Sequence, residues 1–263
     1  GGILDQILER LSIYIEKAVK LKAQVKSALI YPVVICLVAI GIVVLIMYKV
    51  IPTFEAMFKS SGQELPGMTR VTLEASRFTQ NYLIFIIVAM VLIFIALRQY
   101  HLTYHGRRVV DKVMLKIPVL GGLLQKISIA RFCRTLSTLI SSGVPILDGI
   151  EITAKTSGNA IVEDSLMIVR KDIEEGKTIA EPLSKLPLFP PMVVSMIGVG
   201  ETTGAIDVML SKIADFYEDE VDVAVAGLMS LLEPILIIFL GTVIGFIVIS
   251  LYLPIFKLAT TIG

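Results

Sequence analysis

Three long stretches without a charged residue constrain the fold of this chain more than any other feature. They cover residues 27–48, 78–97 and 234–256 and are 22, 20 and 23 residues long. At about 1.5 Å per residue, a helix of that length reaches roughly 30 Å, the thickness of the hydrocarbon core of a bilayer. We therefore predict three membrane-spanning helices. The first follows a segment of mixed charge and is far from any small-residue cleavage site, so we predict a retained helix and not a signal peptide.

The composition also favours a membrane protein. Of the 263 residues, 55% are hydrophobic and only 18% are charged, too few to cover the surface of a soluble domain of this size. The mean hydropathy is +0.83. Because 24 basic residues nearly balance 23 acidic ones, the net charge is only +1. We therefore expect the lipid bilayer, and no nucleic acid, as a partner.

The basic residues that flank the spans predict the topology. Five basic residues precede the first span and five follow the second, whereas the tail after the third span carries only Lys257. This asymmetry predicts a cytoplasmic N-terminus and a periplasmic C-terminus, although four basic residues between the first two spans weaken it. The predicted division is a cytoplasmic helix at 1–26, spans at 27–51, 78–98 and 232–256, a periplasmic loop at 52–77, a cytoplasmic domain at 99–231 and a periplasmic tail at 257–263.

The sequence repeats itself at an offset of 202 positions. GGILDQILERLSIYIEKAV at the start of the chain aligns with TGAIDVMLSKIADFYEDEV, which begins at Thr203. The match continues into the membrane, where Pro32 aligns with Pro234 and Pro52 aligns with Pro254. The helices that lead into the first and third spans are therefore counterparts, and both spans are expected to run from inside to outside.

The repeat also predicts a missing part. About 75 residues of the second copy, between Lys126 and Gly200, have no counterpart before Gly1. We expect that the natural protein carries an earlier cytoplasmic domain, of which residues 1–26 are the last helix.

The stretch IGVGETTGAIDVML resembles a phosphate-binding loop but does not fit one. Its third glycine, Gly204, is one residue late for the dinucleotide pattern, and the lysine that an ATP loop requires does not follow it. The repeat predicts a helix boundary here instead. Gly200 to Gly204 form a C-terminal turn, Thr202 or Thr203 caps the next helix, and Ala205 begins it.

The segment after the second span has the pattern of a helical bundle. From Gly106 onward, apolar residues recur every three or four positions, as in RFCRTLSTLI and AIVEDSLMIVRKDI. We predict about six helices between residues 107 and 231, and an all-α, polytopic, internally duplicated chain. Glycines mark the predicted helix ends and prolines the starts: Gly143, Gly158, Gly176, Pro145 and Pro190–Pro191.

An acidic strip lies near the root of the last helix. One interpretation is a solvated helix face, and the other is a docking surface for a basic partner or a divalent cation. Its residues are Asp215, Glu218, Asp219, Glu220 and Asp222.

The sequence shows little evidence of a catalytic or metal site. His101 and His105 lie four residues apart and could share a metal on one helix face, but no further ligand stands near them before Asp111, and we prefer interfacial histidines. Cys36 lies in an apolar run and Cys133 in an amphipathic helix, so we predict two small core residues and neither a disulfide nor a zinc site.

Prolines accompany the membrane helices. Pro32 and Pro234 lie near the cytoplasmic start of their spans, where a lost N–H group matters least, and Pro52 and Pro254 are expected to end them. Glu233 is expected in a first helical turn, where its charge suits the helix N-terminus, with a proton relay as the alternative. A rigid helix from the bundle into the bilayer could transmit motion, although simple helix punctuation also explains these prolines.

Several motifs together point to a known family. They are FCRTLSTLISSGVPILDGIEI, LFPPMVVSMIGVGETTGAIDVML and LLEPILIIFLG, with YPVVI, IPTFEAMF and ELPGMTR in the first copy. With these motifs, nearly the whole chain resembles the type II secretion F-protein family, the inner-membrane platform proteins of type IV pili and type II secretion systems. The ending LYLPIFKLATTIG is more similar to the pilus members.

The resemblance implies duplicated six-helix cytoplasmic domains, three spans and a non-enzymatic platform in the bacterial inner membrane, without a cofactor. It implies contacts with a hexameric cytoplasmic assembly ATPase, membrane alignment proteins and pilins, and a homo-oligomer. Some members carry a metal-linked carboxylate, for which Glu201 is the positional candidate here. The alternatives are a small oligomeric transporter or channel subunit, whose spans would need more polar groups than these have, and an ATP-using enzyme.

Overall fold

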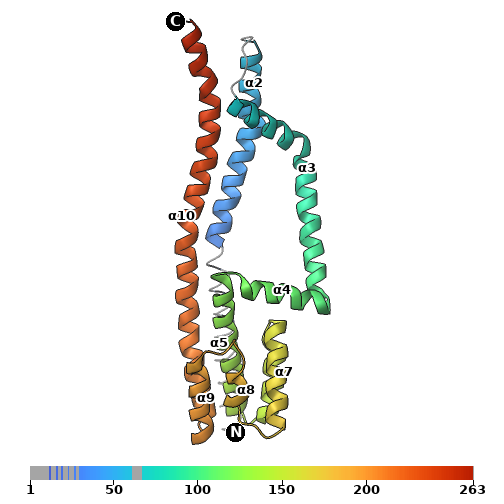
Figure 1. Cartoon of the computed structure of the whole chain (residues 1–263), viewed down its shortest axis with the longest axis vertical. Helices are drawn as coiled ribbons and strands as arrows, with labels where there is room; N and C mark the ends of the chain where they lie inside the picture. Colours follow the sequence, from blue (N-terminus) through green and yellow to red (C-terminus); the bar gives the residue numbers. More distant parts are fainter. Residues whose placement is uncertain are drawn as a thin grey trace. The chain divides into compact units, whose positions relative to one another are not determined.

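The computed structural model describes residues 30–60 and 67–262, together with Ser12, Glu16, Val19, Ala23 and Ser27. This part of the chain is helical without any strand, which confirms the predicted all-α class (Figure 1). The predicted cytoplasmic helix at 1–26 lies almost wholly outside the described residues. After a helical segment at 30–45, the elements are η1 (Ile46–Val50), α2 (Ile51–Ser60), α3 (Gly67–Leu102), α4 (Tyr104–Lys116), α5 (Leu120–Ser141), α6 (Ile146–Thr156), α7 (Ala160–Glu174), α8 (Ala180–Ser184), α9 (Pro191–Thr203) and α10 (Ile206–Ile262).

Three helical stretches are long and apolar enough to cross a membrane, as predicted. They are Ile30–Ala56, Gly67–Leu102 and Ile206–Leu253. The first two extend into the segment 52–77, which the sequence predicts as a loop. This segment is helical where the structure describes it. In α3, Arg70, Glu74 and Arg77 lie on the exposed face, while Thr69, Thr72, Leu73 and Ser76 on the other face are buried.

The chain divides into two compact units. Unit 1 comprises residues 1–28 and 99–228, and unit 2 comprises residues 29–98 and 229–263. Helix α10 contributes its first part to unit 1 and its last part to unit 2.

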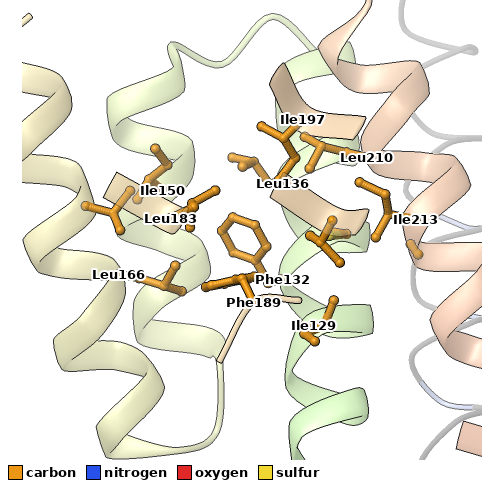
Figure 2. Close-up of a cluster of buried hydrophobic side chains, with 14 of the residues drawn as sticks. Ile129, Phe132, Leu136, Ile150, Leu166, Leu183, Phe189, Ile197, Leu210 and Ile213 are labelled. Carbon is orange, nitrogen blue, oxygen red and sulfur yellow. The ribbon is translucent and has the colours of Figure 1, made fainter. Parts of the chain in front are cut away.

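The core of unit 1 forms around α5 (Figure 2). Phe132 is 1% exposed, and its ring meets the ring of Phe189 edge to face with the centroids 5.1 Å apart. Leu136 and the fully buried Cys133 lie on the same helix, so the prediction of a core cysteine at this position is confirmed, whereas Cys36 in unit 2 is only partly buried. Each large apolar side chain buried in this way stabilises the fold by about 1.5–3 kcal/mol.

Glycines and prolines separate the helices of unit 1 as predicted. Gly143, Gly158 and Gly176 follow α5, α6 and α7 with φ of 84°, 81° and 91°, a left-handed conformation that L side chains rarely adopt. Pro145 and Pro190 are the N-cap residues of α6 and α9.

The helix boundary in IGVGETTGAIDVML is confirmed, but two details differ. Gly204 ends α9 with φ of 74°, and α10 begins at Ile206. Thr202 and Thr203 do not cap α10, because their hydroxyls donate to carbonyl oxygens of their own helix. Gly200 lies within α9, where a Cβ would stand 3.0 Å from the Cα of Ile206, so it permits the close approach of α10.

The membrane prolines do not end their helices. Pro254 and Pro234 both lie inside α10, which continues to Ile262. Glu233 is therefore far from a helix N-terminus, and its predicted first-turn position is wrong. Pro32 lies in the helical segment 30–45, and Pro52 is the second residue of α2.

A π-helical turn accommodates Pro52. The five residues of η1 end immediately before α2, and the N–H of Ile51 donates to the carbonyl of Ile46, five residues earlier. A π-turn widens the helix, which relieves the clash between the proline ring and the preceding turn. The helix therefore continues through the proline.

The two histidines lie on different helices. His101 is in the last turn of α3, Thr103 has an extended backbone, and His105 is in the first turn of α4. The shared helix face that their spacing suggests is therefore absent.

Candidate functional site at the root of α10

A partly buried arginine joins α5 to the α10 root, the part of α10 at residues 206–228. Arg134 has a side chain only 11% exposed and donates to Asp215 at 2.5 Å and to Glu218 at 2.8 and 3.0 Å. Burial opposes its charge, but the hydrogen bonds to Glu218 and Asp215 outweigh that effect and raise the pKa of Arg134. This cluster, the Arg134 clamp, fixes the α10 root against the central helix of the bundle.

Two further contacts tie the same helices together. Lys126 Nζ lies 2.7 Å from Glu220 Oε2, and the hydroxyl of Ser137 donates to the carbonyl of Asp207 at 2.8 Å. Together with the Arg134 clamp, these contacts span about four turns of the α10 root.

The acidic strip predicted from the sequence is thus largely engaged within the bundle. Asp215, Glu218 and Glu220 bind cations of α5, and Asp219 and Asp222 have exposed side chains. Three of the five carboxylates therefore hold α10 against α5. For Asp219 and Asp222, binding of a partner remains a prediction.

Glu201, the predicted metal candidate, has a structural contact. Its carboxylate accepts the backbone N–H groups of Ile179 at 2.8 Å and Ala180 at 3.4 Å, at the start of α8. A carboxylate at this position satisfies amides that a helix start leaves free. Across the residues that the structure describes, no three His, Cys, Asp or Glu side chains gather as a metal site would require.

Unit 2 contains a buried polar contact where its helices meet. The carbonyl of Met47 lacks its usual backbone donors, since the N–H of Ile51 bonds to Ile46 and Pro52 has no N–H group. The side chains of Ser76 and Gln80 on α3 donate to this carbonyl instead. A neighbouring helix thus supplies the donors that the backbone around Pro52 cannot.

The same region links α3 to α10. The hydroxyl of Thr69 donates to the carbonyl of Ser250 at 2.6 Å. Ile51, Leu73, Ile247 and Leu251 form the apolar cluster around this contact. The packing of the three membrane helices therefore combines small polar groups with a short apolar seam, as is common between membrane helices.

One apolar pocket of about 280 Å³ lies in the bundle. Gln125 on its wall donates to the carbonyls of Pro187 and Leu188. No lining residue carries a carboxyl, imidazole, amine or thiol group that could act as an acid or base, and the hydroxyl of Ser165 donates to the carbonyl of Ile161. The lining is Leu115, Gly121, Gln125, Ile161, Val162, Ser165, Leu186, Pro187 and Leu188.

Comparison with known proteins identifies the family. A family model described as type II secretion system (T2SS), protein F matches residues 1–52 and 132–254. The chain belongs to the type II secretion system protein F family. The second matched segment contains the Arg134 clamp, and the two segments end 202 residues apart, the offset of the internal repeat. The family resemblance seen in the sequence is confirmed.

Named relatives in this family cover the whole chain. It is 52% identical over 262 residues to the type IV pilus assembly protein PilC of Myxococcus xanthus, in a match that spans 100% of this chain and 63% of the relative. It is 42% identical to the protein of the same name from Thermus thermophilus, across 100% of this chain and 65% of the relative. It is 32% identical to the type II secretion system protein F of Vibrio cholerae, across 98% of this chain and 64% of the relative. The chain thus spans less than two thirds of the length of these relatives.

Sequence reasoning found the family but missed the Arg134 clamp and the donors to Met47. The only signal for the clamp is the spacing of Asp215 and Glu218, which places two carboxylates on one face of a helix. The partner, Arg134, lies more than 70 residues earlier, and nothing local to it indicates the pairing.

Proposed function

We propose that this chain is part of an inner-membrane platform for the assembly of a type IV pilus or of the related filament of a type II secretion system. It is proposed to act mechanically, without catalysing a reaction itself. The names of the relatives support this role, since those from Myxococcus xanthus and Thermus thermophilus are named as type IV pilus assembly proteins.

The observation that carries the proposal is the continuity of α10. It is one helix from Ile206 to Ile262, about 85 Å at 1.5 Å per residue, and no turn separates its bundle part from its membrane part (Figure 1). The Arg134 clamp holds the bundle part to α5. We propose that this helix passes a movement of the bundle to the membrane part.

The proposed partners follow from this mechanical role. A hexameric cytoplasmic ATPase would move the bundle, alignment proteins of the membrane would hold the platform in place, and pilins would be lifted from the bilayer into the filament. We also propose a homo-oligomer, with a cytoplasmic N-terminus and a periplasmic C-terminus. The exposed Asp219 and Asp222 are the candidate contact points for a basic surface of the motor.

Affinity purification and gene deletion test this function. The intact protein, purified from its host in mild detergent, is expected to bring the assembly ATPase and at least one alignment protein with it. Deletion of the gene is expected to abolish surface filaments or secretion. Recovery of neither partner, together with normal filaments and secretion after deletion, would contradict the proposal.

Charge reversal tests the proposed contact points. Asp219→Lys with Asp222→Lys should reduce recovery of the ATPase without reducing the amount of protein in the membrane. Glu175→Lys with Glu181→Lys, at exposed sites on other elements, is the matched control.

A further inference from the structure

Helix α4 packs on the bundle through one face only. The carboxylate of Asp111 is buried and accepts the N–H of Ala160 at 2.6 Å. Arg108 binds Asp164 at 2.6 and 2.7 Å, and Arg107 lies 3.3 Å from Glu163. These contacts turn this face of α4 toward α7.

The opposite face of α4 combines valines with lysines. Val109 and Val113, one turn apart, are 50% and 56% exposed, and Ile117 continues the row at 41%. Lys112 and Lys116 are exposed beside them. Asp111 is the only acidic residue of α4, and it lies on the packed face. The exposed face therefore carries apolar and basic side chains and no acidic one.

A strained turn with a further exposed valine follows α4. Val119 has φ of 69° and ψ of −55°, and the N–H of Leu120 donates to the carbonyl of Pro118 at 2.8 Å, which makes Val119 the centre of a γ-turn. A β-branched residue in this conformation costs about 1–3 kcal/mol. Its side chain is nevertheless 58% exposed, so packing inside the bundle does not explain a valine here.

The position of α4 in the chain indicates what covers this face. The candidate membrane span of α3 ends at Leu102, and only Thr103 separates it from α4. The hydroxyl of Thr103 accepts the N–H of Gly106 at 3.1 Å and so fixes the start of α4 at the end of the span. Tyr104, although 69% exposed, stacks under the guanidinium of Arg108, 3.6 Å from the ring centroid, and so lies on the side of α4 that faces α7.

We propose that α4 and the Val119 turn form a lipid-docking face, made of Val109, Lys112, Val113, Lys116, Ile117 and Val119, that lies on an anionic membrane surface. The apolar side chains enter the boundary between headgroups and acyl chains, and the lysines bind lipid phosphates. This inference concerns the membrane contact of the bundle and is independent of the proposed role in filament assembly.

A single tryptophan provides the test, because the chain has none. The probe is the whole protein carrying Val113→Trp, reconstituted in phosphatidylcholine vesicles with or without phosphatidylglycerol, with acyl chains brominated or not. The control is Val199→Trp, at a valine of α9 that is 52% exposed. Circular dichroism confirms equal helical content of the two variants.

The proposal predicts that bromine quenches the fluorescence of the Val113→Trp variant, more strongly with phosphatidylglycerol, and that the Val199→Trp variant is not quenched. An emission typical of water with no quenching of the probe in either lipid, or equal quenching of the two variants, overturns it. A blue shift that rises with the protein-to-lipid ratio but is insensitive to bromine means that a second copy covers this face, which also overturns it.

Charge reversal distinguishes the contribution of the lysines to membrane docking from that of the apolar side chains. Lys112→Glu with Lys116→Glu should remove the effect of phosphatidylglycerol on quenching of the Val113→Trp probe, since each lysine near an anionic surface contributes about fivefold to the docked population. Reversal of the exposed Lys171 and Lys212 should leave the effect unchanged. Equal effects of the two pairs would mean that net charge alone acts, and would overturn the proposed face.

Discussion

Arg134 and Glu218 meet across two helices through two parallel N–H···O contacts, with Nε 2.8 Å from Oε1 and Nη2 3.0 Å from Oε2. This fork geometry requires the planar guanidinium of arginine, and a lysine cannot reproduce it. Because Arg134 is 11% exposed while Asp215 and Glu218 are 46% and 22% exposed, the pair is anchored in the core but remains partly hydrated at its acidic side.

Loss of the arginine should weaken the bundle. Arg134→Gln is expected to lower the unfolding free energy by about 1–3 kcal/mol, since two partly buried carboxylates lose their charged donor. Arg134→Lys should recover less than half of that loss. The measurement is the thermal midpoint of the protein in detergent, followed by circular dichroism. Lys155→Gln, which removes an exposed i,i+4 pair with Glu151, is the control and should cost less than about 0.5 kcal/mol.

Alanine substitutions at two adjacent glycines of α5 should have different effects on stability. A Cβ at Gly121 would overlap the carbonyl oxygen of Leu115, whereas a Cβ at Gly122 would meet no atom within 4 Å. Gly121→Ala should destabilise by about 1–3 kcal/mol, because backbone has to move. Gly122→Ala should be neutral or stabilising by up to about 1 kcal/mol. Equal thermal midpoints for the two variants would contradict the close packing of the α4–α5 turn.

The contribution of Ser76 and Gln80 to stability, through their hydrogen bonds to the carbonyl of Met47, should depend on Pro52. Ser76→Ala with Gln80→Leu should lower stability in detergent by about 0.5–1.5 kcal/mol, the range for hydrogen bonds between membrane helices. Pro52→Ala restores an N–H group that can reach the carbonyl of Met47, so the same double substitution should cost much less in that background. Denaturant titration of the four proteins of this mutant cycle gives the coupling free energy between Pro52 and the two donor side chains. Additive effects on the unfolding free energy would contradict the proposed dependence.

Cys133 should make stability fall at alkaline pH. Burial raises the pKa of its thiol, against a smaller lowering by Arg134. The folded pKa then lies above the unfolded value of about 8.5, so the contribution is complete below that pH and is lost as pH rises, by at most about 1.4 kcal/mol per pH unit. Cys133→Ala should flatten the dependence of the thermal midpoint on pH above about 8.5. An unchanged slope, or alkylation of Cys133 in the folded protein at neutral pH, would count against the buried thiol.

The three spans and the turn glycines could be predicted because each leaves a local mark. A bilayer excludes charge over about 20 residues, and a left-handed backbone selects glycine, as at Gly143 and Gly204. The extent of the helices was less predictable. A charge count assigns Arg70 and Arg77 to a loop, although they lie on the exposed face of α3.

Contacts between distant residues could not be predicted from local pattern. Arg134 and Glu218 are 84 positions apart and Ser76 and Met47 are 29 apart, so their pairing depends on how helices pack. The acidic strip is an example, because its composition left open a solvated helix face or a docking surface, whereas in the structure three of its five carboxylates bind cations of α5. Pro52 and Pro254 were expected to end helices, but a π-turn or the absence of water lets a membrane helix continue through them.

Gly227, in the last turn of the α10 root, allows the most direct test of mechanical coupling through α10. A Cβ there meets no atom within 4 Å, so Gly227→Ala fits and strengthens the helix, whereas Gly227→Pro removes a backbone hydrogen bond and kinks the helix at a cost of about 3 kcal/mol. Both variants are placed in the intact protein in its host, and surface filaments are counted at equal membrane levels of the protein. We predict normal filaments with alanine and loss of filaments with proline, while the ATPase still co-purifies with both. Normal filament numbers with proline would contradict the account.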